Sequence, residues 1–320
     1  MSRTRWFVMI AVAAVVGVAV ASPEPAPTGK ICAVGDLLAQ VRSMGRGSPA
    51  YRKYVTRLLR EAAPDLDERE LVAAFEAERD PAMIELLGAA LAARTDRLGE
   101  PGPLRTVAAR ALEAGDPAAR AAATRALRGT SALEHAPELY KRLVQDGSPE
   151  VRREAAENLV NDTAAVFGGQ HGPAADTAVA AAIAASDPEV TARVLGGVSM
   201  SAISHDSAVA LRGLLDSPSR DIRGASVVAL GGVPGGEAAA ARAALLALYR
   251  AEHDAAIRTA ILESIARLGF ADAIPDLESL RTVDPALAIE IDDWVRVLRL
   301  GLQEWSLILR EKRLSEQARK

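Results

Sequence analysis

Apolar residues recur along this chain in pairs that are eight positions apart. Three positions before the first residue of each pair stands an aspartate or a serine, and both can accept hydrogen bonds from the free N–H groups at the start of a helix. These residues are Asp80, Asp116, Ser148, Asp187, Ser219, Asp254 and Asp284. The apolar pairs are Met83 and Leu91, Ala119 and Leu127, Val151 and Leu159, Val190 and Val198, Ile222 and Leu230, Ile257 and Ile265, and Leu287 and Val295. Because such positions fall on one helical face, the pattern predicts seven helices that each bury one side.

Proline and arginine reinforce this register. Proline follows the capping residue directly at Pro81, Pro117, Pro149, Pro188 and Pro285. At the first helical position the missing N–H of proline costs nothing and its fixed φ suits the helix. Arginine follows the first apolar residue at Arg120, Arg152, Arg223 and Arg258.

A second apolar stretch precedes each of these helices. The stretches are Leu66–Glu78, Leu104–Ala114, Pro137–Val144, Thr177–Ala185, Val209–Leu214, Ala238–Arg250 and Pro275–Leu280. The helix starts are spaced 36, 32, 39, 32, 35 and 30 residues apart, and a period of this size is typical of stacked helical pairs. The fold class expected is therefore all-α, a right-handed α-solenoid of about seven helical pairs, with the second helix of each pair lining the concave face.

Two segments carry a family resemblance. Asp116–Leu127 (DPAARAAATRAL) and Ser148–Leu159 (SPEVRREAAENL) resemble HEAT repeats, particularly the HEAT-like repeats of bilin lyases. The resemblance extends over roughly residues 66–298. It implies a stack of helical pairs, and it favours recognition over catalysis because the family includes many scaffolds and few enzymes.

The N-terminus has the features of an export signal. Arg3 and Arg5 precede an uncharged apolar run, residues 6–21, that ends in small residues on either side of Val20. Cleavage after Ala21 would leave an exported, periplasmic or envelope protein of a bacterium. The alternative is an uncleaved N-terminal membrane anchor, although such a run rises only about 24 Å as a helix and a hydrocarbon core is about 30 Å thick.

The expected organisation is a signal peptide at 1–21, a proline-containing linker at 22–33, an N-terminal helical cap at 34–63, the repeats at 64–298 and a C-terminal capping helix and tail at 299–320. Terminal repeats need polar outer faces. Trp294 and Trp305 are expected to seal the last apolar face. Cys32 is the only cysteine, so no internal disulfide and no cysteine metal site are expected.

Charge argues against a nucleic-acid partner. The chain has 38 basic and 42 acidic residues and a formal net charge of −4, whereas phosphate binding requires concentrated positive charge. The stretch Arg310–Lys320 is locally basic. It is interpreted as a solvated helix end whose cations suit the helix dipole, with an anion-binding tail as the alternative. A membrane contact is expected only if the N-terminal segment is uncleaved.

Candidate chemistry is sparse. The histidines His135, His171, His205 and His253 are not paired at metal-ligand spacing, and no His-Glu dipeptide occurs. No serine or cysteine lies in a recognisable nucleophile motif. We therefore expect no catalytic residues, no metal and no cofactor. The alternative function is that of a bilin-lyase-like enzyme or cofactor-handling protein.

The leading hypothesis is a non-enzymatic scaffold of the bacterial cell envelope that binds a protein or peptide on its concave face. Two positions of the second helices, offsets 2 and 6 from the first apolar residue, should point away from the core. They give the candidate partner-binding residues Arg125, Arg153, Glu157, Glu263 and Asp293. Two glycine-rich connections, residues 167–173 and 231–236, are interpreted as flexible links. The first is alternatively a recognition loop with Phe167 and His171 exposed.

Overall fold

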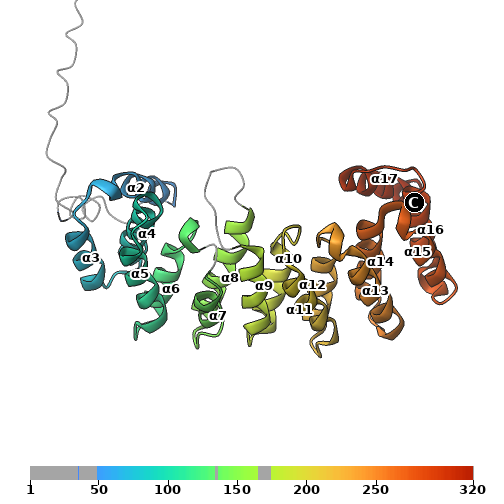
Figure 1. Cartoon of the computed structure of the whole chain (residues 1–320), viewed down its shortest axis with the longest axis horizontal. Coiled ribbons are helices and arrows are strands. Elements are labelled where there is room, and N and C mark those ends of the chain that lie inside the picture. Colours follow the sequence, from blue (N-terminus) through green and yellow to red (C-terminus); the bar gives the residue numbers. More distant parts are fainter. Residues whose placement is uncertain (1–34, 36–48, 134–135, 165–173, 320) are drawn as a thin grey trace, which may run out of the picture.

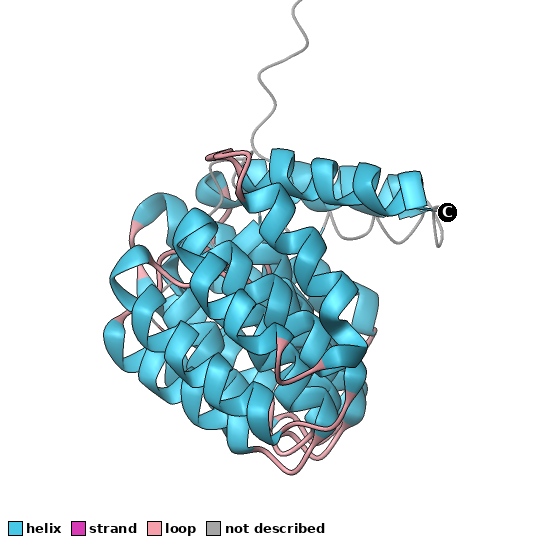
Figure 2. Cartoon of the chain, turned by 90° about the vertical axis from the view of Figure 1, so that its right-hand side faces the viewer, coloured by secondary structure: helices cyan, strands magenta, loops and turns pink. Residues whose placement is uncertain are grey.

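The structure is a computed structural model that describes residues 35, 49–133, 136–164 and 174–319. In this part of the chain every regular element is an α-helix or a short 3-10 helix, and there is no strand (Figure 2). The all-helical class expected from the sequence is therefore confirmed. The expected signal peptide, the linker with Cys32 and the start of the N-terminal cap lie outside the described residues.

The helices alternate as the two apolar patterns predict. The helices on the first pattern are α3 (Glu68–Ala77), α5 (Pro101–Glu113), α7 (Pro137–Leu143), α9 (Ala175–Ala184), α11 (His205–Gly213), α13 (Gly235–Ala251) and α15 (Ile274–Arg281). The helices on the second pattern are α4 (Pro81–Leu98), α6 (Pro117–Ala126), α8 (Pro149–Ala164), α10 (Pro188–Gly197), α12 (Arg220–Leu230), α14 (Ala255–Gly269) and α16 (Ala288–Leu298). Each helix overlaps the stretch that the sequence predicts for it.

Neighbouring helices pack in two parallel series. The even-numbered helices contact one another in chain order from α4 to α16, and the odd-numbered helices do so from α3 to α13. Each odd-numbered helix from α3 to α15 also packs on the even-numbered helix that follows it. The result is an elongated row in which position along the row follows position along the chain (Figure 1).

The helix starts use the capping residues that the sequence predicts. Asp80, Asp116, Asp187 and Asp254 each accept a hydrogen bond from a backbone N–H in the first turn of the following helix, and so does Ser219. Proline occupies the first position of α4, α6, α8 and α10. These contacts satisfy N–H groups that the helix itself leaves without partners.

The core follows the predicted register. All seven apolar residues at the second position of each pair are buried, from Leu91 to Val295. Five of the seven at the first position are buried as well, and the exceptions, Ile222 and Leu287, are partly exposed. Small residues allow the helices to approach closely: a Cβ added at Gly197 would lie 2.5 Å from Val160 Cγ1.

The last pair departs from the register. Asp284 caps a 3-10 helix, Pro285–Leu287, and α16 begins only at Ala288. Asp293 was expected to be exposed, and this is wrong, because only 4% of its surface is accessible. Its carboxylate accepts a hydrogen bond from Ser315 Oγ at 3.0 Å and one from Arg296 at 2.9 Å. The 3-10 turn and the covering C-terminal helix together explain the difference.

A further helix closes each end of the row. At the N-terminal end, α2 (Pro49–Ala62) packs on α4, and at the C-terminal end α17 (Trp305–Arg319) packs on α16. The expected role of the tryptophans is confirmed: Trp294 is buried and stacks on Trp305 with ring centroids 5.6 Å apart, and Phe270 meets Trp305 edge-on at 6.4 Å. Figure 2 shows the final helix lying across the stacked helices.

The second glycine-rich connection is not a loose link. A Cβ added at Gly231 would lie 2.8 Å from Ser264 Oγ on α14, so this glycine permits a close contact between α12 and α14. Gly235 and Gly236 form the first turn of α13. The first connection, with Phe167 and His171, lies outside the described residues. None of the described helices has the length and apolar character needed to cross a membrane.

Candidate functional site

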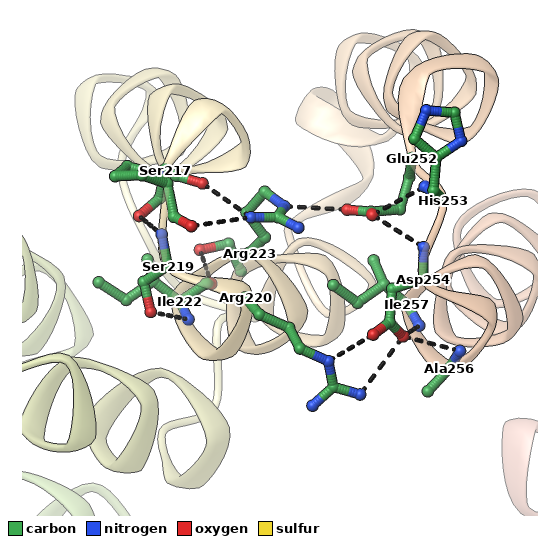
Figure 3. Close-up of polar contacts among 12 residues, drawn as sticks. Ser217, Ser219, Arg220, Ile222, Arg223, Glu252, His253, Asp254, Ala256 and Ile257 are labelled. Atoms are coloured by element: carbon green, nitrogen blue, oxygen red, sulfur yellow. Dashed lines mark hydrogen bonds and ion pairs between the residues drawn. The ribbon is translucent and has the colours of Figure 1, made fainter.

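The arginine that follows the first apolar residue joins consecutive repeats. In the unit of α12, Arg223 donates from one nitrogen to the carbonyls of Ser217 and Pro218 at 3.1 and 3.2 Å, and from another to Glu252 at 2.9 Å (Figure 3). Glu252 also accepts hydrogen bonds from the backbone N–H groups of His253 and Asp254. The pKa of Glu252 is held below its usual value, chiefly by the hydrogen bond from Arg223.

The same contact recurs in other repeats. Arg120 binds both carboxylate oxygens of Asp146 at 2.8 and 2.9 Å, and Arg152 binds Asp187 at 2.9 Å. Each also donates to carbonyls of the loop before its own helix. Arg258 pairs with Asp284 at 2.9 Å. These guanidinium groups tie the loop before α6 to the loop before α8, the loop before α8 to the loop before α10, and the loop before α12 to the loop before α14.

The exposed surface of the even-numbered helices carries ion pairs between neighbouring helices. Arg125 on α6 pairs with Glu85 on α4 at 2.9 Å and with Glu154 on α8 at 3.1 Å. Burial acts to lower the pKa of Arg125, but the hydrogen bonds that it donates to these carboxylates, together with their negative charges, raise the pKa above its usual value. Arg125 was predicted to be an exposed partner-binding residue; it is instead largely buried and bridges three helices.

A groove of about 660 Å³ lies between α8 and α10 on this surface. Two of the predicted residues, Arg153 and Glu157, line it from α8. Arg193 and Glu189 line it from α10, and Asp221 from α12. Glu157 and Arg193 form a two-point ion pair across the groove, at 2.8 and 3.1 Å, which raises the pKa of Arg193. The groove floor includes Ala156 and Val190, both buried.

The rim of the groove carries charged side chains that do not form ion pairs within the described repeats. Arg153 and Glu189 are exposed, and neither forms an ion pair with another described residue. Asp221 is exposed too and lies 3.7 Å from Arg220, whose main partner is Asp254 (Figure 3). Exposed guanidinium and carboxylate groups on two sides of an apolar floor suit an extended segment that offers backbone amides and side chains of both charges.

The sequence pattern predicts the lining residues that α8 contributes to this groove but not those of α10. It identified offsets 2 and 6 of α8 but not Glu189 and Arg193, which occupy the position just before the first apolar residue of α10 and the position three after it. A groove between two stacked helices is lined by different offsets from each. An alignment of adjacent repeats would have identified acidic and basic residues that face each other across the groove.

The other predicted residues that the structure describes do not line the groove. Glu263 is exposed on α14, and no described residue forms an ion pair with it. Asp293 is buried beneath α17. The structure therefore brings together Arg153 and Glu157 in the groove, while Glu263 and Asp293 lie on other helices.

A histidine and a carboxylate also lie together where α11 meets α13. His205 is exposed and lies 2.7 Å from Glu237, which also binds Arg212 at 3.0 Å. These contacts, from His205 first, hold the pKa of Glu237 below its usual value. Within the described ranges, no group of three or more histidine, cysteine, aspartate or glutamate side chains could hold a metal ion.

A second groove of similar volume lies between α3 and α5, and sequence reasoning did not find it. Arg110 lies over the Phe75 ring at 4.9 Å and donates hydrogen bonds to the carbonyls of Phe75 and Glu78. Burial lowers the pKa of Arg110. This arginine is engaged in holding α5 against α3, whereas the exposed side chains of Glu76, Arg105 and Glu113 line the groove without forming an ion pair with another described residue.

Comparison with protein-family models finds none that matches the chain, and comparison with curated proteins finds no match.

Proposed function

We propose that this protein is a non-enzymatic scaffold that binds a protein or peptide along the surface of its even-numbered helices. The row of helices would be a right-handed α-solenoid of about seven HEAT-like pairs, with these helices lining the concave face, and the protein would be exported to a bacterial cell envelope. The single observation that carries the binding role is the groove between α8 and α10, where Arg153 and Glu189 remain exposed and unpaired among the described residues. Rigid loops and an extended surface suit recognition rather than the enclosure of a small molecule.

Charge at the rim predicts how the partner binds. Complementary charges accelerate association, and salt screens this effect. Each solvent-exposed ion pair between the groove rim and a partner adds little to the affinity. Arg153→Glu should therefore slow association roughly threefold to tenfold with little effect on dissociation. Folding should be unchanged, because Arg153 makes no ion pair with a described residue. Reversal of Arg125 is unsuitable, since it would place a fourth carboxylate beside Glu85, Glu150 and Glu154.

The experiment has two stages. A photo-crosslinking residue at Ala192, which lines the groove, should capture a specific protein from a bacterial envelope extract, while the same residue at the exposed Ala239 on α13 should not. Surface plasmon resonance with the captured protein then measures Arg153→Glu, with Arg105→Glu on α5 as the matched charge control. Capture at both positions alike, or an unchanged association rate in Arg153→Glu, would remove the groove as the binding site.

A further inference from the structure

The two end helices lie on the same side of the molecule. In Figure 1 the row runs horizontally, and α2 and α17 both lie along its upper edge, one at each end. Figure 2, which keeps the same vertical direction, again shows the C-terminal helix across the top of the stack. The two helices therefore offer two contact points to one flat surface.

The outer face of α17 combines leucine with unpaired arginine. Ile308, Lys312 and Ser315 are buried against α16, and the opposite face exposes Leu307, Arg310, Arg313 and Leu314. Leu307 and Leu314 are 40% and 47% exposed. Neither Arg310 nor Arg313 forms an ion pair with another described residue.

The structure holds this face outward. Lys312 is buried, lies 4.9 Å from the Trp294 ring centroid, and pairs with Glu290 at 2.7 Å and with Glu316 at 2.6 Å. Although burial acts to lower the pKa of Lys312, these two carboxylates raise it, so the amine stays charged. The stacked tryptophans secure the first turn of the helix. The buried side chains of α17 therefore fix the orientation of the helix, and its opposite face stays exposed.

The helix α2 repeats the combination at the other end. Leu59 is buried, whereas Tyr54 and Leu58 are 58% and 44% exposed. Arg57 lies between them in sequence and is exposed, and Glu61, one turn away, is its only ion-pair partner among the described residues.

Charge separates these two helices from the rest of the chain. Together they contain eight of the 38 basic residues but only three of the 42 acidic ones. The remaining repeats are consequently acidic on balance. A positive, partly apolar face on an otherwise acidic molecule is attracted to an anionic surface and oriented by it.

We propose that the outer faces of α2 and α17 bind the surface of a membrane rich in anionic phospholipid. Arginine stems and leucine side chains enter the interfacial region while the guanidinium groups contact lipid phosphates. Binding of both helices to one surface multiplies two weak affinities, since the second contact forms at high effective concentration. The same face of a second copy fits poorly here, because two basic faces would repel each other. The row of repeats would then be held parallel to the membrane with its partner groove free.

The test reports on α17 itself. In a Cys32→Ser background, Gln317→Cys on the exposed face is labelled with an environment-sensitive fluorophore, and the full chain is mixed with phosphatidylglycerol-containing or pure phosphatidylcholine vesicles. The label should move to an apolar environment only with the anionic vesicles, and about 0.5 M salt should reverse the change. The same label at Ala239 on α13 should not respond. The label at Ala239 distinguishes contact by α17 itself from recruitment of the whole chain through residues 1–48.

Charge variants complete the test. Arg310→Glu with Arg313→Glu should weaken the apparent affinity for anionic vesicles roughly tenfold or more, and Arg310→Gln with Arg313→Gln should weaken it less. Arg105→Glu with Arg267→Glu makes the same charge change at exposed positions on α5 and α14 and should have little effect. The proposal is overturned by an unchanged response in the double reversal, by an equal response to neutral vesicles, or by a response that grows with protein concentration in the absence of vesicles.

Discussion

At the scale of single residues, arginine forms most of the polar contacts described between neighbouring repeats. The residues at the position after the first apolar one looked like repeat markers in the sequence, and the structure shows that they bind the loops of two neighbouring repeats. Arg120, Arg152 and Arg223 each join carbonyls of their own loop to a carboxylate of the next. A guanidinium group has enough N–H donors in one plane for both tasks, which a lysine cannot perform in the same geometry.

These pairs predict how stability depends on pH. Arg220 and backbone N–H groups lower the pKa of Asp254 to about 2, and the pKa values of Asp146, Asp187, Glu237 and Glu252 are also below their usual range. A carboxylate whose pKa is lower in the folded than in the unfolded state stabilises the fold above its unfolded pKa. That stabilisation is lost as pH falls through the folded pKa. The free energy of unfolding should therefore fall between about pH 4 and pH 2.

Urea unfolding followed by circular dichroism at several pH values measures this dependence. Arg220→Gln removes the main partner of Asp254 and should make the decline shallower. Glu263→Gln removes an exposed carboxylate that has no ion pair among the described residues, so it should leave the slope as in the wild type. A slope unaffected by Arg220→Gln would show that this pair does not contribute to the acid sensitivity.

At the scale of helices, the sequence predicts positions well and boundaries less well. The apolar stretch Val209–Leu214 marks only part of α11, which begins at His205 because Ser204 accepts a hydrogen bond from the N–H of Ser207. The burial of Asp293 has a similar cause. The apolar spacing does not tell whether residues 285–287 form an α-helical or a 3-10 turn, and the 3-10 turn that forms shifts the register of α16. Apolar spacing identifies the buried face, but caps and tertiary packing fix where each helix starts.

Two adjacent glycines in α10 test the close packing of helices. A Cβ at Gly197 would meet both methyl groups of Val160, whose branched side chain has little rotational freedom, whereas a Cβ at Gly196 meets nothing within 4 Å. Gly197→Ala should destabilise the protein by about 1–3 kcal/mol through overpacking. Gly196→Ala should be neutral or should stabilise it by up to about 1 kcal/mol, because alanine favours the helix. Chemical denaturation of both variants compares them directly, and equal stabilities would contradict the close approach of α8 and α10.

At the scale of the whole molecule, the contacts of each helix are local in sequence. The even-numbered series and the odd-numbered series each run in chain order, and the ends are closed by separate helices. The period of the apolar pattern was sufficient to predict this arrangement, because each pair must bury its apolar faces against the next one. The groove was harder to predict, since its lining comes from three helices and depends on which charges the repeats pair with one another.

We expect the described part of the chain to behave as a one-dimensional stack, in which stability is the sum of the repeats and their neighbouring interfaces. Asp187→Ala tests it most directly, because it removes both the cap of α10 and the partner of Arg152. Loss of such a cap costs about 0.5–2 kcal/mol, and Asp187→Asn, which retains the capping oxygen, serves as the milder control. Hydrogen exchange followed by mass spectrometry should show lost protection in α10 and, less strongly, in α8 and α12, with α4 and α16 unchanged. Equal loss of protection along residues 49–133, 136–164 and 174–319, or none in α10, would contradict the account.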